Sequence, residues 1–156
     1  MKLNNIFTNN YLWGGAMTDE IIHLLSERNR YLSQFSVINK VQIGRLKVGN
    51  FEQLSEFYMT REHILAVVEK IELLLGQKLE QSEADITDEN RSAVENLLLA
   101  KDTIIKEILD QDLEILSTIE QEKTSIISEL KTLKKGRKTI TAYKSGITNS
   151  KLDEEA

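Results

Sequence analysis

Apolar residues recur at helical spacing from Thr87 to Tyr143, and no glycine interrupts them before Gly136. Along one face they are mostly seven or four residues apart, which is typical of a helix packed in a bundle or coiled coil. A helix over residues 88–134 would be about 70 Å long, more than the width of a compact domain of this size. We therefore expect long partner helices and an end that extends past them. The face comprises Leu97, Ile104, Ile108, Ile115, Ile119, Ile126, Leu130 and Leu133.

Two amphipathic segments precede this stretch and predict a helical hairpin. Thr18 is a suitable cap for a helix over about 18–47, and Gly49-Asn50 breaks the pattern before a second helix over about 51–81. Such a short connection makes the two helices antiparallel. A third helix over about 88–135 completes the fold. The fold class is all-α: an antiparallel helical hairpin plus one long third helix, a coiled-coil-like three-helix up-down-up bundle with flexible termini.

The apolar faces also predict the core and the domain limits. Leu65 and Ile108 lie on these faces, so we expect aspartate at either position to unfold the bundle. Residues 1–17 lack an apolar period and predict a flexible leader before a bundle domain at 18–135. Residues 136–156 form a basic and then acidic tail, which we expect to be helical to about 144 only under some conditions.

The composition argues against an enzyme. The chain has no cysteine and only two histidines, His23 and His63, and its glycines form no phosphate-binding loop. We therefore expect no catalytic residues, no metal and no cofactor. Lys101, Asp112 and Glu122 interrupt the third apolar face, either as solvated edge positions or as residues that specify helix register. No segment has the length and hydropathy of a signal peptide or a membrane span, so we expect a cytoplasmic protein without stable membrane insertion.

The charge changes abruptly near residue 131. Residues 51–130 carry 19 acidic and 7 basic residues, whereas residues 131–144 carry six basic and no acidic ones. Two interpretations remain open: basic residues that complement a helix C-terminus, or a docking segment. The net charge of −5 gives nucleic acid no overall attraction, so we expect no nucleic-acid partner, and a basic tail that contacts RNA or lipid is a minor alternative.

Two parts of the chain resemble the FlgN/FliT-type small helical chaperones of flagellar type III export, the FlgN side most closely. The first part is the hairpin, with residues 27–32, the turn at 46–54 and residues 61–65. The second is more specific: residues 133–144, with Gly-Arg-Lys and Ala-Tyr elements, are similar to the FlgN C-terminus. Thr139 and Thr141 depart from the more apolar residues of that pattern. Together the matches span residues 20 to 153.

The resemblance implies a cytoplasmic chaperone that binds C-terminal helical segments of hook–filament junction proteins of the FlgK/FlgL type and delivers them to the FlhA-type export gate. Tyr143 would correspond to the family's gate-contacting tyrosine. The amphipathic pattern agrees, because a long helix that extends past its bundle offers an apolar groove to a partner helix. The candidate cargo-binding residues are Ile126, Ile127, Leu130, Leu133 and Ile140.

A second function class explains the same apolar stripe. In a structural coiled-coil or homodimerising scaffold protein, a second copy of the chain would bury it. Under the chaperone interpretation we expect a monomer or a weak homodimer.

Overall fold

The computed structural model describes the backbone of residues 4–81 and 87–154, and the side chains of residues 17–81 and 87–146. Three helices account for nearly all of it: α1 (Asn4–Lys47), α2 (Leu54–Gln81) and α3 (Asp88–Glu154). No strand occurs among these residues. The protein is therefore all-α, as predicted.

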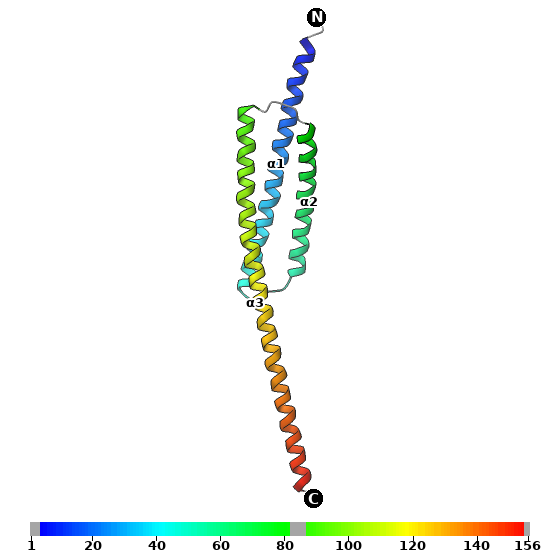
Figure 1. Ribbon diagram of the computed structural model, residues 1–156, viewed down its shortest axis with the longest axis vertical. Coiled ribbons are helices and arrows are strands. Elements are labelled where there is room, and N and C mark those ends of the chain that lie inside the picture. Colours follow the sequence, from blue (N-terminus) through cyan, green and yellow to red (C-terminus); the bar gives the residue numbers. More distant parts are fainter. Residues whose placement is uncertain (1–3, 82–86, 155–156) are drawn as a thin grey trace. The chain divides into compact units, whose positions relative to one another are not determined.

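The chain divides into two compact units. The first, Met1–Ile115, contains α1, α2 and the early part of α3, which lie side by side as a helical bundle (Figure 1). The second, Leu116–Ala156, consists of the remainder of α3. A single helix thus contributes residues to both units.

The connection between α1 and α2 is fixed by local backbone preferences. α1 ends at Lys47, and Gly49 follows with a φ of 74°, a left-handed conformation that glycine adopts without steric cost. Gln53 is also left-handed, with a φ of 63°, so α2 begins after it at Leu54 rather than at the predicted Phe51. Asn50 Oδ1 accepts a hydrogen bond of 3.0 Å from the Glu52 backbone N–H, which closes the turn.

Thr87 caps the start of α3. Thr87 Oγ1 accepts a hydrogen bond of 3.3 Å from the backbone N–H of Asn90, and Asp88 and Glu89 lie in the first turn of the helix. Negative charge there complements the positive end of the helix dipole. Most of the predicted gap between the second and third helices, residues 82–86, lies outside the described residues.

Both end segments differ from the prediction. The structure has α1 beginning at Asn4, within the predicted leader, and α3 continuing to Glu154, through the predicted tail. The chain contains no proline, and an isolated glycine costs a helix only about 1 kcal/mol, so Gly14, Gly15 and Gly136 do not end these helices.

The core of the first unit consists of two apolar clusters. Ile21 and Leu25 of α1 pack with Ile71 and Leu75 of α2, and Val94 and Leu97 of α3 complete this cluster. Burying one such side chain contributes about 1.5–3 kcal/mol. The second cluster lies further along α1 and earlier in α2, and consists of Leu32, Phe35, Ile64 and Ile108.

The two predicted core positions have different outcomes. Ile108 is 7% exposed, which confirms it as a core residue. Leu65 is 43% exposed, so its assignment to the core was wrong. Its neighbour Ile64, at 6%, occupies the buried position instead. The apolar stripe of α2 is wider than the surface that the other helices cover, and Leu65 lies at its uncovered edge.

Several polar residues occupy core positions of α1 that the sequence analysis did not assign to the core. Arg28, Asn39 and Gln42 are all buried, whereas the apolar Val41 is 51% exposed. A polar side chain at a core position needs hydrogen-bonding partners from neighbouring helices. For Arg28 this partner is Glu72 of α2, at 3.1 Å.

Asp112 of α3 links all three helices of the first unit. It accepts hydrogen bonds from Asn39 Nδ2 of α1 and from Arg61 Nη2 of α2, both at 2.9 Å. Arg61 also lies over the Phe35 ring, 4.5 Å from its centroid. Asp112 was predicted to be either a solvated edge residue or a residue that specifies helix register. This geometry favours the second role, because a shifted helix would leave Asp112, Asn39 and Arg61 without these partners.

Candidate functional site

All six residues predicted to bind partners lie on α3 within the second unit. Each side chain is substantially exposed, and none belongs to either apolar cluster of the first unit. Surface apolar residues scattered singly are ordinary, but a continuous exposed stripe marks an interaction surface. Their exposed fractions are 48% for Ile126, 44% for Ile127, 57% for Leu130, 64% for Leu133, 57% for Ile140 and 71% for Tyr143.

The spacing of these residues is that of a coiled-coil seam. From Lys123 to Ile140, successive positions on one face are three, four, three, four and three residues apart. This strict heptad alternation defines a narrow seam rather than a broad apolar face. We call it the 123–140 seam: Lys123, Ile126, Leu130, Leu133, Arg137 and Ile140.

A shallow hollow of about 450 Å³ lies along this seam. Three of the predicted cargo-binding residues line it, while Ile126, Ile140 and Tyr143 do not. Three cations share the hollow with the apolar residues, and no carboxylate lines it. The lining residues are Ile127, Leu130, Leu133, Lys131, Lys134 and Arg137.

The five cations at positions 131–138 have no partner in the described part of the chain. Lys131, Lys134, Lys135, Arg137 and Lys138 are exposed, and none forms an ion pair with a described residue. The basic run is visible in the sequence, but Lys131, Lys134 and Arg137 were not among the predicted partner-binding residues. Their i, i+3 spacing could have identified them, because it places the three side chains along one side of a helix.

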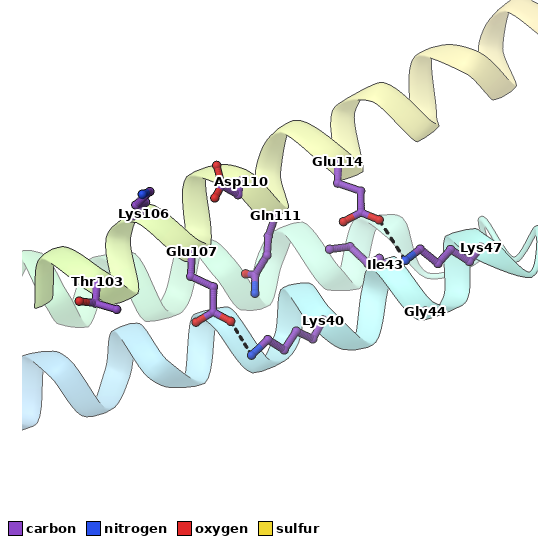
Figure 2. Close-up of a pocket in the computed structure, with 10 residues that line it drawn as sticks. All are labelled: Lys40, Ile43, Gly44, Lys47, Thr103, Lys106, Glu107, Asp110, Gln111 and Glu114. Carbon is purple, nitrogen blue, oxygen red and sulfur yellow. Dashed lines mark ion pairs between the residues drawn. The ribbon is translucent and has the colours of Figure 1, made fainter. Parts of the chain in front are cut away.

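A larger cleft of about 630 Å³ lies between α1 and α3 in the first unit (Figure 2). Two ion pairs cross it: Lys40 with Glu107, and Lys47 Nζ with Glu114 Oε1 at 3.1 Å. The hydrogen bond from Lys40 lowers the pKa of the Glu107 carboxyl below its ordinary value. Three lysines and three carboxylates line the cleft, so it offers no surplus charge to a ligand. This cleft was not predicted from the sequence, and its two ion pairs link α1 to α3.

Other kinds of site find no support in the described segments. They contain no group of three or more histidine, aspartate or glutamate side chains placed to hold a metal ion. His23 and His63 are both exposed. None of the helices, as far as they are described, has the length and apolar character required to cross a membrane.

The candidate site is thus an exposed apolar seam flanked by cations that pair with no described residue, a surface suited to binding a partner. Comparisons of this chain with protein-family models, with curated proteins and with solved structures gave no match.

Proposed function

We propose that this protein is a FlgN-like export chaperone that acts in the cytoplasm. Its second unit binds the C-terminal helical segments of hook–filament junction proteins of the FlgK/FlgL type, and it delivers them to an FlhA-type export gate. The chaperone does no bond chemistry and needs no cofactor.

One observation carries the proposal: the exposed stripe from Ile126 to Ile140. Burying an apolar side chain of this size contributes about 1.5–3 kcal/mol, and the described residues leave these side chains at least 44% exposed. An amphipathic helix that lies in a groove contacts its partner through apolar side chains three or four residues apart. A helical cargo segment would therefore gain stability from the same residues that are left uncovered here.

The first unit has a supporting role in this proposal. We propose that α1, α2 and the early part of α3 form an up-down-up three-helix bundle that orders the early part of α3. The order of the contacts supports an antiparallel arrangement of α1 and α2. Early residues of α1, Ile21 and Leu25, pack with late residues of α2, Ile71 and Leu75. The later residues Leu32 and Phe35 of α1 pack with the earlier Ile64 of α2. A helix ordered before binding loses less conformational entropy when the cargo docks.

The test uses two leucines of α3 with nearly equal exposure. Leu133 is 64% exposed and Leu113 is 67% exposed, but only Leu133 lies on the 123–140 seam. Leu133→Asp should weaken the binding of a FlgK/FlgL-type C-terminal segment by at least about tenfold, the loss expected when an interface anchor is removed. Leu113→Asp should leave the affinity unchanged. Fluorescence titration measures both affinities, and melting curves show whether both variants fold.

Equal affinities for the two variants, or a large loss of melting temperature for Leu133→Asp alone, would contradict the assignment of this surface. The second result would place Leu133 in the folded core.

The gate contact is assigned to Tyr143, whose side chain is 71% exposed. Tyrosine is favoured in interfaces because it offers a large contact area with few rotatable bonds. Tyr143→Ala should leave cargo affinity within about threefold of the wild type while weakening binding to the cytoplasmic domain of an FlhA-type gate protein by tenfold or more. If Tyr143→Ala binds the gate protein as tightly as the wild type, Tyr143 is not the gate contact. If the variant loses cargo binding, Tyr143 belongs to the cargo-binding surface.

The homodimerising scaffold is the competing proposal, because a second copy would also cover the stripe. Light scattering separates the two. A stable dimer that Leu133→Asp dissociates supports the scaffold, whereas a monomer or weak dimer that binds the cargo segment supports the chaperone.

A further inference from the structure

We propose that the segment bound by the 123–140 seam is an acidic amphipathic helix, with carboxylates placed to face Arg137 and the lysines beside the seam. This inference rests on the proposed function and goes beyond it by specifying the charge of the partner. The partner is recognised by its chemistry: apolar residues at heptad spacing, flanked by aspartate or glutamate.

The seam fits a helix better than it fits a lipid surface. A helix that lies on a membrane has a broad apolar face, usually with phenylalanine or tryptophan. The 123–140 seam is narrow, contains no aromatic residue and includes Lys123 and Arg137 within the apolar row. Strict heptad spacing is the pattern of helix-to-helix packing, in which side chains of one helix insert between those of the other.

The charges around the seam favour an acidic partner. Lys131 and Lys134 line the apolar hollow together with Arg137, and none of the three pairs with a described residue. A partner helix that covers Leu130 and Leu133 necessarily brings its own flanking side chains next to these cations. Acidic flanks would gain attraction there, neutral flanks would gain none, and basic flanks would be repelled.

A second copy of the chain that packs parallel and in register fits this seam poorly. In such a dimer, Arg137 would meet Arg137 and Lys123 would meet Lys123 at the centre of the interface. The same dimer would gain one flanking attraction, between Glu129 and Lys134, and such a surface pair contributes only about 0.2–1 kcal/mol. That gain is small beside the cost of burying like charges together.

The experiment measures binding of the full chain to three synthetic amphipathic peptides of about four heptads. The peptides share the same apolar residues and carry glutamate, glutamine or lysine at the flanking positions. The glutamate peptide should bind at least about tenfold tighter than the glutamine peptide, because several ion pairs each contribute about 0.2–1 kcal/mol. The lysine peptide should bind weakest, and added salt should narrow the differences.

Two charge reversals on α3 provide a matched control. Arg137 lies within the seam, whereas Lys135 lies on the opposite side of the helix. Lys135 is nine residues, or two and a half turns, after Ile126. Arg137→Glu should weaken binding of the glutamate peptide by about fivefold or more, while Lys135→Glu should change it by less than about twofold. A triple reversal of Lys131, Lys134 and Arg137 to glutamate should invert the order and favour the lysine peptide.

The outcomes separate this inference from the proposed function. If the glutamate and glutamine peptides bind equally and Leu133→Asp weakens both, the surface binds helices but does not select an acidic one, and only this inference fails. If no peptide and no FlgK/FlgL-type segment binds, the proposed function fails with it. Stable dimerisation through the seam, or tighter binding to phosphatidylserine vesicles than to any peptide, would also overturn the inference.

Discussion

The two parts of α3 have similar apolar patterns but different surroundings. Before residue 116, Ile108 and Ile115 are buried against other helices of the first unit, with exposed fractions of 7% and 1%. After it, Ile126 and Leu133 occupy comparable positions in the pattern but are 48% and 64% exposed. Helical periodicity therefore identifies which residues share a face. It does not show whether another part of the chain covers that face.

The cations of the two units differ in the same way. In the first unit, Lys40 and Lys47 pair with acidic residues of α3, and Arg61 pairs with Asp112. In the second unit, Lys131, Lys134 and Arg137 pair with no described residue. Before residue 116, α3 contributes acidic residues that pair with cations of α1 and α2; after it, Lys131, Lys134 and Arg137 pair with no described residue. This contrast supports the second unit as the surface that a partner would complete.

The heptad spacing itself changes near the boundary between the units. Up to Ile115 the positions on the covered face alternate between intervals of four and three residues. The intervals from Gln111 through Ile115 and Ile119 to Lys123 are then all four. An added step of four residues, a stutter, locally unwinds a coiled coil. The seam that packs in the first unit and the seam exposed in the second are therefore two separate patterns on one helix.

The most disruptive test of this comparison puts one charge into each part of α3. Ile108→Asp should unfold the first unit or lower its melting temperature severely, because an unpaired buried carboxylate costs several kcal/mol out of a total stability of about 5–15. Ile126→Asp introduces the same side chain at a position that is 48% exposed and should change the melting temperature by only about 2 °C or less. Circular dichroism melts measure both. Equal losses of stability would show that the second unit is as well covered as the first.

Amide hydrogen exchange compares the stability of the two parts of α3 without a mutation. Amides of α3 at residues 104–112 should be protected to nearly the global stability, because tertiary packing holds this part of the helix. Amides at residues 126–140 should exchange at least about a hundredfold faster, since an isolated helix is only marginally stable in water. Mass spectrometry of proteolytic fragments resolves the two segments. Equal protection in both would contradict the exposed state of the second unit, and added cargo segment should slow exchange at 126–140 only.

Much of the fold could be predicted because its signals are local. Thr87 caps α3 through its own hydroxyl, and Gly49 allows the left-handed turn after α1, so neighbouring residues alone indicate these features. The helical spacing of apolar residues also predicted the apolar stripe at 126–140. The α2 start could not be predicted in the same way, because the left-handed conformation of Gln53 is uncommon for a residue other than glycine.

The remaining features depend on residues far apart in the sequence. A count of apolar residues passes over Asn39 and Gln42, yet these occupy core positions, where Asp112 provides the partner for Asn39. Leu65 was assigned to the core because it is apolar and correctly spaced, although its side chain is 43% exposed. The cations at Lys131 and Arg137 became part of the candidate site only when the structure placed them in one hollow with Leu130 and Leu133.

The polar network provides a smaller test of what holds the first unit together. Asp112→Ala would leave Arg61, whose side chain is 15% exposed, and the buried Asn39 without their shared acceptor. We expect a loss of about 2 kcal/mol in unfolding free energy, measured by urea denaturation, because a buried donor without a partner retains its desolvation cost. Glu114→Ala removes an ion pair at the surface and should cost about 0.5 kcal/mol or less. Similar losses would show that the network has no special role in register.

The smallest expected effect is the pH dependence of the Lys40–Glu107 ion pair in the first unit. The hydrogen bond from Lys40 lowers the pKa of Glu107 below its ordinary value of 4.5, so the folded protein favours the ionised carboxylate. The stabilisation is therefore fully present above about pH 5 and is lost as the pH falls through the lowered pKa. Glu107→Gln should lower the melting temperature by about 1–2 °C at pH 7 and by less near pH 3, where the wild type has also lost the charge. The exposed Glu129 of the second unit is the matched control: Glu129→Gln should leave the melting temperature at pH 7 within about 1 °C of the wild type, because Glu129 forms no ion pair with a described residue. A pH-independent difference for Glu107→Gln would mean that the carboxylate does not contribute through its charge, and the contrast in pairing between the units would then rest on the other ion pairs of the first unit, such as Arg61 with Asp112.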